Sequence, residues 1–163
     1  MKKVYDDTEF MNIASKVLFN EEFLKTKKII HHGTTRYDHS VRVAYLSYKL
    51  SKIVGGDRNS IIKAGALHDF FLEEYDNNIV KEAKMLVNHP SIAKQNAISY
   101  FGVNKKEENI IESHMFPMSN VMPKYKESWI VSIADKIVAL RENAMRAKAQ
   151  VSLWTILILN FLR

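Results

Sequence analysis

The sequence predicts an all-α fold, organised as one globular domain of seven or eight helices over residues 1–163. Apolar residues recur at spacings of three and four through most of the chain, which is the period of a helix buried on one face. No segment alternates apolar and polar residues for long, and no Asn-Gly or Asp-Gly pair marks a hairpin. A chain of 163 residues is long enough to enclose a full hydrophobic core.

The first two helices are delimited by a cap, a basic loop and a pair of glycines. Thr8 is expected to cap the first helix, and a basic loop follows from Lys25 to Gly33. Thr34 or Thr35 can start the second helix, which Gly55-Gly56 ends. The inward positions predicted for these helices are Phe10, Ile13, Ala14, Val17, Leu18, Phe23, Val41, Ala44, Tyr45, Tyr48 and Ile53.

Helix signals continue through the middle of the chain. A third helix, capped by Asn59 or Ser60, is expected to lead to His68-Asp69, and a shorter one to span residues 79–86. Pro90 suits the first turn of a further helix that Gly102 ends. Asn104 is expected to cap the next helix, which has acidic residues in its early turns.

Two helices are predicted after the proline-containing loop at residues 115–125. A long one covers residues 126–147, and a separate apolar one covers residues 151–162. The last helix is too short for a bilayer, which requires about 20 apolar residues, so it is expected to close the core or to form a homodimer face. The inward residues predicted for the long helix are Ile130, Val131, Ile133, Ala134, Ile137, Val138 and Leu140.

The amino-acid composition limits the kinds of metal site, nucleophile and partner that the protein can have. The absence of cysteine excludes disulfides, thiolate zinc sites and cysteine nucleophiles, and it is compatible with a cytoplasmic protein. The net charge of +6 suits anionic small molecules. Because the lysines and arginines are scattered, we expect no nucleic-acid partner. The N-terminus lacks an apolar leader, so neither a signal peptide nor a membrane partner is expected.

Residues suited to metal binding stand at or near the ends and flanks of five predicted helices. Any metal must be held by His, Asp, Glu or water, because no thiolate is present. Asp135 is notable because it interrupts a strongly apolar run, where a carboxylate needs a metal or a buried salt bridge. Taken singly, each of the others is compatible with an ordinary surface or hydrogen-bonded residue. The complete set is His39, His68, Asp69, His89, His114 and Asp135.

The order of these residues resembles that of the HD-domain superfamily of metal-dependent phosphohydrolases, in particular the subset with two additional histidines. That resemblance implies an all-helical fold and a dinuclear centre. His39, His68, Asp69 and Asp135 would hold the first ion, and Asp69 would bridge to a second ion held by His89 and His114. The matching segments are Arg36–Ala44, Ala64–Asp69, His89–Ala93, Ile111–His114 and Ile133–Ile137, so the motif core spans residues 36–140.

The resemblance also implies a reaction. A hydroxide between two divalent ions would attack phosphorus, and imidazole with carboxylate suits iron, manganese, nickel or zinc, with magnesium also compatible. The expected substrate is a small phosphorylated molecule, most naturally a nucleotide. Besides Asp69, Arg36 and Lys136 are candidate catalytic and phosphate-binding residues, with Lys94 and His32 as further substrate contacts. Residues 31–33 could equally form an ordinary polar loop.

One departure from the family pattern leaves the activity open. Many relatives carry a lysine three residues after the aspartate of the doublet, where this chain has Leu72. A phosphomonoesterase, a phosphodiesterase and a dinucleoside polyphosphate hydrolase all stay open, and the chain looks similar to the symmetrical diadenosine tetraphosphate hydrolases. The alternatives are a metal-binding nucleotide sensor with little turnover and, on the same scaffold, a di-iron oxygenase.

Overall fold

Helices make up almost all of the regular structure in this protein. The structure, a computed structural model, describes residues 2–31, 33–73 and 79–161, with side chains described for residues 4–30, 33–73 and 84–150. The all-α prediction is confirmed. The helices are α1 (Lys2–Tyr5), α2 (Thr8–Leu18), α3 (Glu21–Leu24), α4 (Arg36–Val54), α5 (Arg58–Leu67), α6 (Ile79–Phe101), α7 (Lys105–Ser113) and α8 (Lys126–Phe161).

A short non-α segment lies where a basic loop was predicted. It begins with the 3-10 turn η1 (Lys25–Lys28) and continues into the two-residue strands β1 (Ile30–His31) and β2 (Thr34–Thr35). The strands are antiparallel, with Ile30 opposite Thr35 and His31 opposite Thr34. This hairpin leads directly into α4, the helix that carries His39.

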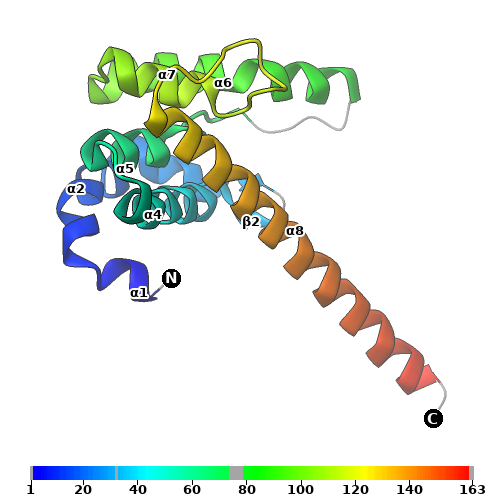
Figure 1. Ribbon diagram of the computed structural model, residues 1–163. Helices are drawn as coiled ribbons and strands as arrows, with labels where there is room; N and C mark the ends of the chain where they lie inside the picture. The colour runs from blue at the N-terminus through cyan, green and yellow to red at the C-terminus, as the bar shows by residue number, and fades with distance from the viewer. Residues whose placement is uncertain (1, 32, 74–78, 162–163) are drawn as a thin grey trace.

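Helix α5 lies at the centre of the packing and contacts α2, α4, α6, α7 and α8. Helices α6 and α7 lie side by side as one layer, and α2, α4 and α5 form the body beneath it (Figure 1). Helix α8 packs across α4, α5 and α7 and then continues away from the body (Figure 1). Elements far apart in sequence therefore meet around the end of α5.

Side-chain caps begin the main helices, although not always at the predicted residue. Asp7 caps α2 by accepting from the Phe10 amide, so the prediction of Thr8 was one residue late. Asp57 caps α5 by accepting from two amides of the first turn, and the predicted caps, Asn59 and Ser60, are the residues that donate them. In both cases an aspartate stood just upstream, and its carboxylate reaches the free amides of the first turn. Thr35 and Asn104 cap α4 and α7, as predicted.

The core contains most of the residues that helical periodicity selected. Phe10, Ala14, Val17, Leu18, Phe23, Val41, Ala44 and Tyr48 are buried, while Ile13 and Tyr45 are partly buried against the core. Ile53 was wrongly placed inward, since it is 82% exposed near the end of α4. Gly55, with φ +78°, ends α4 there and turns the chain toward α5.

Two predicted helix breaks are absent. Pro90 lies inside α6 rather than at a helix start. An interior proline costs a helix about 3 kcal/mol, and the packing of α6 against α7 helps to offset that cost. Helix α8 continues without a break through the predicted gap at residues 148–150, where Lys, Ala and Gln all favour helix.

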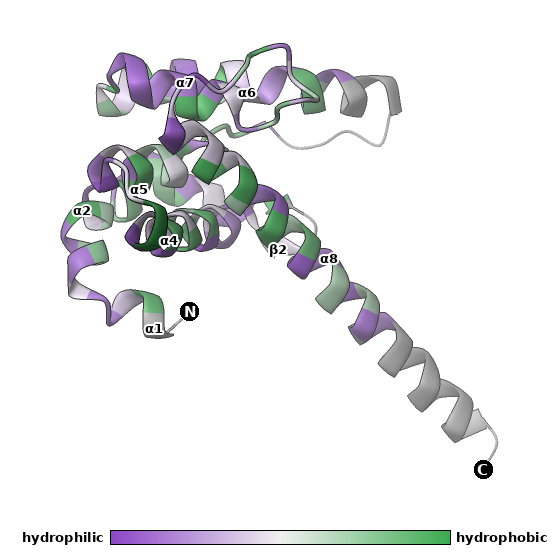
Figure 2. Ribbon diagram, in the orientation of Figure 1, coloured by the Kyte–Doolittle hydropathy of each residue, from purple (hydrophilic) through white to green (hydrophobic). Residues whose placement is uncertain are grey.

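The inward face of α8 is narrower than the sequence predicted. Ile130, Val131, Ala134 and Val138 are buried, whereas Ile133, Ile137 and Leu140 are substantially exposed. The helix packs on the body along one side only, and its apolar residues extend around more of its circumference. Figure 2 shows polar and apolar residues interspersed along this part of α8. No helix in the described ranges combines the length and apolar character needed to cross a bilayer.

Candidate metal centre

All six predicted ligand residues converge in one buried region. His39 lies on α4, His68 and Asp69 directly follow α5, His89 lies in α6, His114 directly follows α7, and Asp135 lies on α8. Each has at most 8% of its surface exposed. Asp69 and Asp135 are carboxylates with little access to water, so their charge must be balanced locally.

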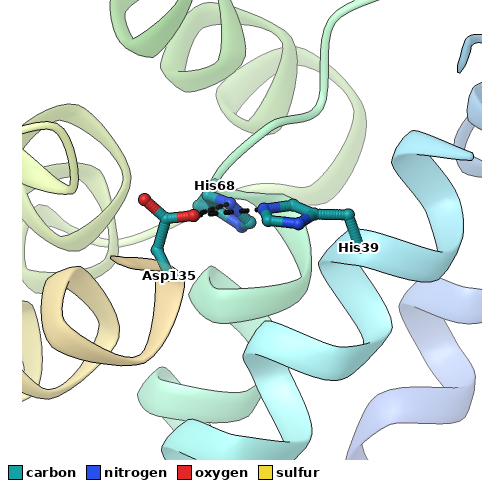
Figure 3. A group of neighbouring side chains, drawn as sticks. All are labelled: His39, His68 and Asp135. Atoms are coloured by element: carbon teal, nitrogen blue, oxygen red, sulfur yellow. Dashed lines mark hydrogen bonds and ion pairs between the residues drawn. The ribbon is translucent and has the colours of Figure 1, made fainter. Parts of the chain in front are cut away.

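One group of ligand atoms joins α4, the end of α5 and α8. The Nε2 atom of His39 lies 3.1 Å from Oδ1 of Asp135. The Nε2 atom of His68 lies 3.6 Å from the same oxygen. These three residues offer ligand atoms within 4.8 Å of one another, and Figure 3 shows the three side chains pointing toward a common point. That separation can accommodate a metal ion.

A second group is arranged around the Asp69 carboxylate. Its Oδ1 atom lies 3.3 Å from Nε2 of His89 and 3.5 Å from Nε2 of His114. Its Oδ2 atom lies 3.6 Å from Nε2 of His68. The two oxygens of Asp69 thus face different histidines.

The outer nitrogen of every histidine in the centre has a protein acceptor. Nδ1 of His68 lies 2.8 Å from the Gly65 carbonyl, Nδ1 of His114 lies 2.7 Å from the Ile111 carbonyl, and Nδ1 of His89 lies 3.2 Å from the Met85 carbonyl. A carbonyl only accepts, so each Nδ1 carries the proton and each Nε2 presents a lone pair inward. This orientation is the one that metal-binding histidines adopt.

The fourth histidine is held by a carboxylate. Nδ1 of His39 lies 2.9 Å from Oε2 of Glu142, a buried residue of α8 that the sequence analysis missed. Glu142 follows Asp135 by seven residues, which places both on one side of a helix after two turns. The seven-residue spacing from Asp135 is the sequence signal that could have identified Glu142.

The inward-facing atoms fit a cation. Among the described side chains, Nε2 of His68 and Oδ1 of Asp69 are buried polar atoms without a hydrogen-bond partner. Buried polar atoms are ordinarily paired, and these two point into a region filled with other acceptors. Imidazole nitrogens and carboxylate oxygens together suit divalent iron, manganese, nickel or zinc. The residues present therefore fit the divalent metal site that the sequence predicts.

Burial and charge together set the protonation of the centre. Burial lowers the pKa of His114 to about 3, which keeps its ring neutral and able to bind a metal. Burial also disfavours the charged form of His39, but hydrogen bonds to Asp135 and Glu142 outweigh it and raise the pKa of His39 to about 10. Burial would raise the pKa of the Asp69 and Asp135 carboxyls. The neighbouring histidines instead hold both pKa values below the usual range.

Arg36, expected to bind phosphate, lies in the interior and contacts the chain that follows Asp69. Its Nη1 atom donates to the Phe71 carbonyl, and its Nη2 atom donates to the Glu73 carbonyl at 3.2 Å. The guanidinium lies 3.4 Å above the Phe71 ring, and that ring stacks on His89 with centroids 5.2 Å apart. Arg36 thus supports a histidine of the centre through Phe71, a contact that no sequence pattern indicated.

The other predicted substrate contacts are placed differently from one another. Lys136 donates to the His114 carbonyl at 3.0 Å and to Oγ of Ser132 at 2.8 Å, which ties α8 to the end of α7. Lys94 forms a 2.6 Å ion pair with Glu112. His32 lies outside the described residues.

Comparison with known proteins identifies one family. The model of the HD domain matches residues 36–140, about two thirds of the chain and the range that carries all six ligand residues. No curated protein matches the chain, and no solved structure matches it.

Proposed function

This chain belongs to the HD domain family, within the superfamily of metal-dependent phosphohydrolases, and we propose that it hydrolyses a small phosphate ester or anhydride. A nucleotide is the expected substrate. The observation that carries the proposal is the convergence of four Nε2 atoms and two carboxylates in one buried region.

We propose that the centre holds two divalent ions. His39, His68, Asp69 and Asp135 would hold one, while Asp69, His89 and His114 would hold the other. The two orientations of the Asp69 oxygens support this division. When bound, such a pair of ions lowers the pKa of a shared water and stabilises charge on phosphoryl oxygens.

The protein orients the metal ligands and provides a route by which a substrate can approach them. The three carbonyl contacts and Glu142 fix the histidine rings, so the centre is organised before a substrate arrives. Asp135 is the most exposed of the six ligands, which supports substrate approach along its side of α8. Lys136 follows Asp135 directly, and burial lowers its pKa while the Asp135 charge opposes that change. We propose that this lysine fixes the end of α7 and helps attract phosphate.

A metal-loaded activity screen tests the proposal. Protein purified without chelator should contain iron, manganese, nickel or zinc, and it should hydrolyse a member of a panel of nucleotides, cyclic dinucleotides, dinucleoside polyphosphates and sugar phosphates. Asp69→Asn should abolish activity and lower metal content. Asp38→Asn, one residue before His39 on α4, is the matched control and should retain both. Metal-free protein, or hydrolysis unchanged in Asp69→Asn, would refute the assignment.

A second candidate is a nucleotide sensor that retains metal but turns over little. It is favoured because Arg36, Lys94 and Lys136 each contact a protein acceptor, and because Leu72 replaces the lysine of many relatives. The same screen separates the two candidates. Micromolar nucleotide binding without hydrolysis would support the sensor, and rapid hydrolysis of any panel member would exclude it. We propose that either activity operates in the cytoplasm, with which the lack of cysteine is compatible.

A further inference from the structure

Glu142 is a buried carboxylate directly behind the predicted metal centre. Only 4% of its side-chain surface is exposed. Its Oε2 atom contacts Nδ1 of His39 at 2.9 Å, and its Oε1 atom accepts from Nη1 of Arg42 at 2.6 Å. A buried carboxylate is costly unless it is paired, and one of the two partners of Glu142 is the candidate ligand His39.

The His39 ring lies between two carboxylates of the same helix. Asp135 contacts its inner nitrogen and Glu142 contacts its outer nitrogen, two helical turns apart on α8. A carboxylate accepts and cannot donate, so Glu142 keeps the proton of His39 on Nδ1. Nε2 then faces Asp135 and His68, where it would coordinate a metal ion once its own proton is displaced.

Arg42 completes the arrangement from α4. It lies three residues after His39, so both project from neighbouring turns of one helix. Besides Glu142, it donates to Oγ1 of Thr34 at 3.1 Å, next to the start of α4. The guanidinium balances the Glu142 charge and aligns the carboxylate, which therefore presents its second oxygen to His39.

This support distinguishes His39 from the other histidines. His68, His89 and His114 donate Nδ1–H to neutral carbonyls, whereas His39 donates to an anion. A charged acceptor makes the opposite nitrogen more basic and the metal bond stronger. The two halves of the centre should therefore differ in affinity, with the half containing His39 the tighter one.

We propose that Glu142 is a positioning residue for the metal half-site of His39, His68 and Asp135. It holds the His39 ring with Nε2 inward, increases its strength as a ligand and, together with Arg42, connects α4 to α8 behind the metal. This inference rests on the dinuclear centre proposed above, but it concerns only one of the two ions.

Stepwise zinc affinity, measured by competition with a chromophoric chelator, tests the role. Glu142→Ala should weaken the tighter ion by about 10–100-fold and leave the weaker ion unchanged. Glu142→Gln should lose less zinc affinity than Glu142→Ala, because its amide oxygen still accepts from Nδ1–H of His39 although it carries no charge. The matched control is Glu127→Gln, a buried carboxylate of the same helix that pairs with Lys106 and the Asp57 amide. It should change stability without changing either zinc affinity.

A second measurement identifies which nitrogen of His39 carries the proton. In ¹⁵N-labelled, zinc-loaded protein, the His39 Nδ1 proton should be visible and protected from exchange with water. That protection should be lost in Glu142→Ala and kept in Glu127→Gln. If Glu142→Ala does not fold, Glu142→Gln supplies the affinity readout, and the tighter zinc ion should still be weakened because the acceptor has lost its charge.

The outcomes separate a failure of the proposed role of Glu142 from a failure of the proposed metal centre. Equal zinc affinities in wild type, Glu142→Ala and Glu142→Gln would overturn the role of Glu142, provided that His68→Ala still loses zinc. A matching loss in Glu127→Gln would also overturn it, because the effect would then be general to buried carboxylates of α8. If His68→Ala retained the tighter zinc ion, the proposed half-site of His39, His68 and Asp135 would be overturned, and the inference with it.

Discussion

The Nε2 atom of His89, in the interior of α6, lies 3.0 Å from the Nε2 atom of His114, which directly follows α7. Both Nδ1 atoms face backbone carbonyls, so in the neutral rings the two inward lone pairs face each other. That contact is unfavourable by itself and becomes favourable when a cation lies between the rings and Asp69. The pair therefore supports the proposal of a second ion, beside the one proposed near His39.

Replacing Asp69 should have a larger effect on metal content than replacing either of these histidines. Asp69→Asn keeps the shape of the side chain but removes the charge that faces both groups, so both ions should be lost. His89→Ala should lose only the ion shared with His114. Elemental analysis of the purified variants measures the stoichiometry. Equal losses in the two variants would contradict the bridging role.

Metal binding near neutral pH should release protons. The pKa of His39 is raised to about 10 in the metal-free protein, so its Nε2 carries a proton that a metal must displace. His114, with a pKa of about 3, is neutral at this pH and has no proton on Nε2 to release. Calorimetry at about pH 7.5 in two buffers of different ionisation enthalpy should therefore show release of at least one proton per protein. Binding without release would mean that His39 is not a ligand.

The metal-free and metal-bound proteins should respond to pH in opposite directions. The pKa of His39 is raised from 6.5 to about 10, so its contribution to stability is full below the unfolded value and lost as pH rises through the folded one. With chelator present, the unfolding temperature should fall between about pH 6.5 and pH 10. With excess zinc it should rise over the lower part of this range, because fewer protons compete for the histidines. Thermal unfolding monitored by circular dichroism measures both curves.

Acid should destabilise the metal-free protein through the carboxylates. The pKa values of Asp69 and Asp135 are lowered from 3.8, so their contribution is present above that value and lost as pH falls through the folded ones. The chelator-treated protein should thus be most stable between the carboxylate and histidine ranges. A stability that does not change with pH across the carboxylate and histidine ranges would contradict the charge arrangement of the centre.

Arg36→Lys should destabilise the protein although it conserves charge. A lysine cannot reproduce the planar contact with Phe71 together with donation to two carbonyls. We expect a loss of about 2–4 kcal/mol in the free energy of unfolding by urea, with weaker metal binding at His89. Arg58→Lys is the control, because Arg58 forms an exposed pair with Glu9 and should change stability by less than about 0.5 kcal/mol. Equal effects would show that the contacts of Arg36 with Phe71 and the two carbonyls contribute little to stability.

Gly65→Ala should separate α5 from α4. A Cβ atom at Gly65 would lie 3.2 Å from the Cα atom of Ala44, which is backbone and cannot rotate away. We expect about 1–3 kcal/mol of destabilisation and weaker zinc binding, because α5 ends at His68 and α4 carries His39. Gly102→Ala meets no atom within 4 Å but has φ +57°, so it should cost about 1 kcal/mol and leave zinc affinity unchanged.

Local signals predicted those features that depend on only a few neighbouring residues. The 3.6-residue period placed Phe10, Val41 and Ala44 in the core, and the caps of α4 and α7 could be predicted because a capping side chain bonds to amides two or three residues away. The predicted breaks at Pro90 and near residue 148 were wrong, since packing and helix-favouring residues outweighed the local signals.

By itself, the sequence determined the helical fold class and the six residues suited to bind metal, because periodicity and residue chemistry are properties of the chain. Only the tertiary structure decided which atoms face the centre and which support it. Arg36, which was predicted to contact phosphate, donates to the Phe71 carbonyl, and Glu142, which was not predicted, contacts His39. Such assignments depend on how α4, α6 and α8 are rotated and spaced against α5 and α7. That packing is set by the whole core, and no short stretch of sequence specifies it.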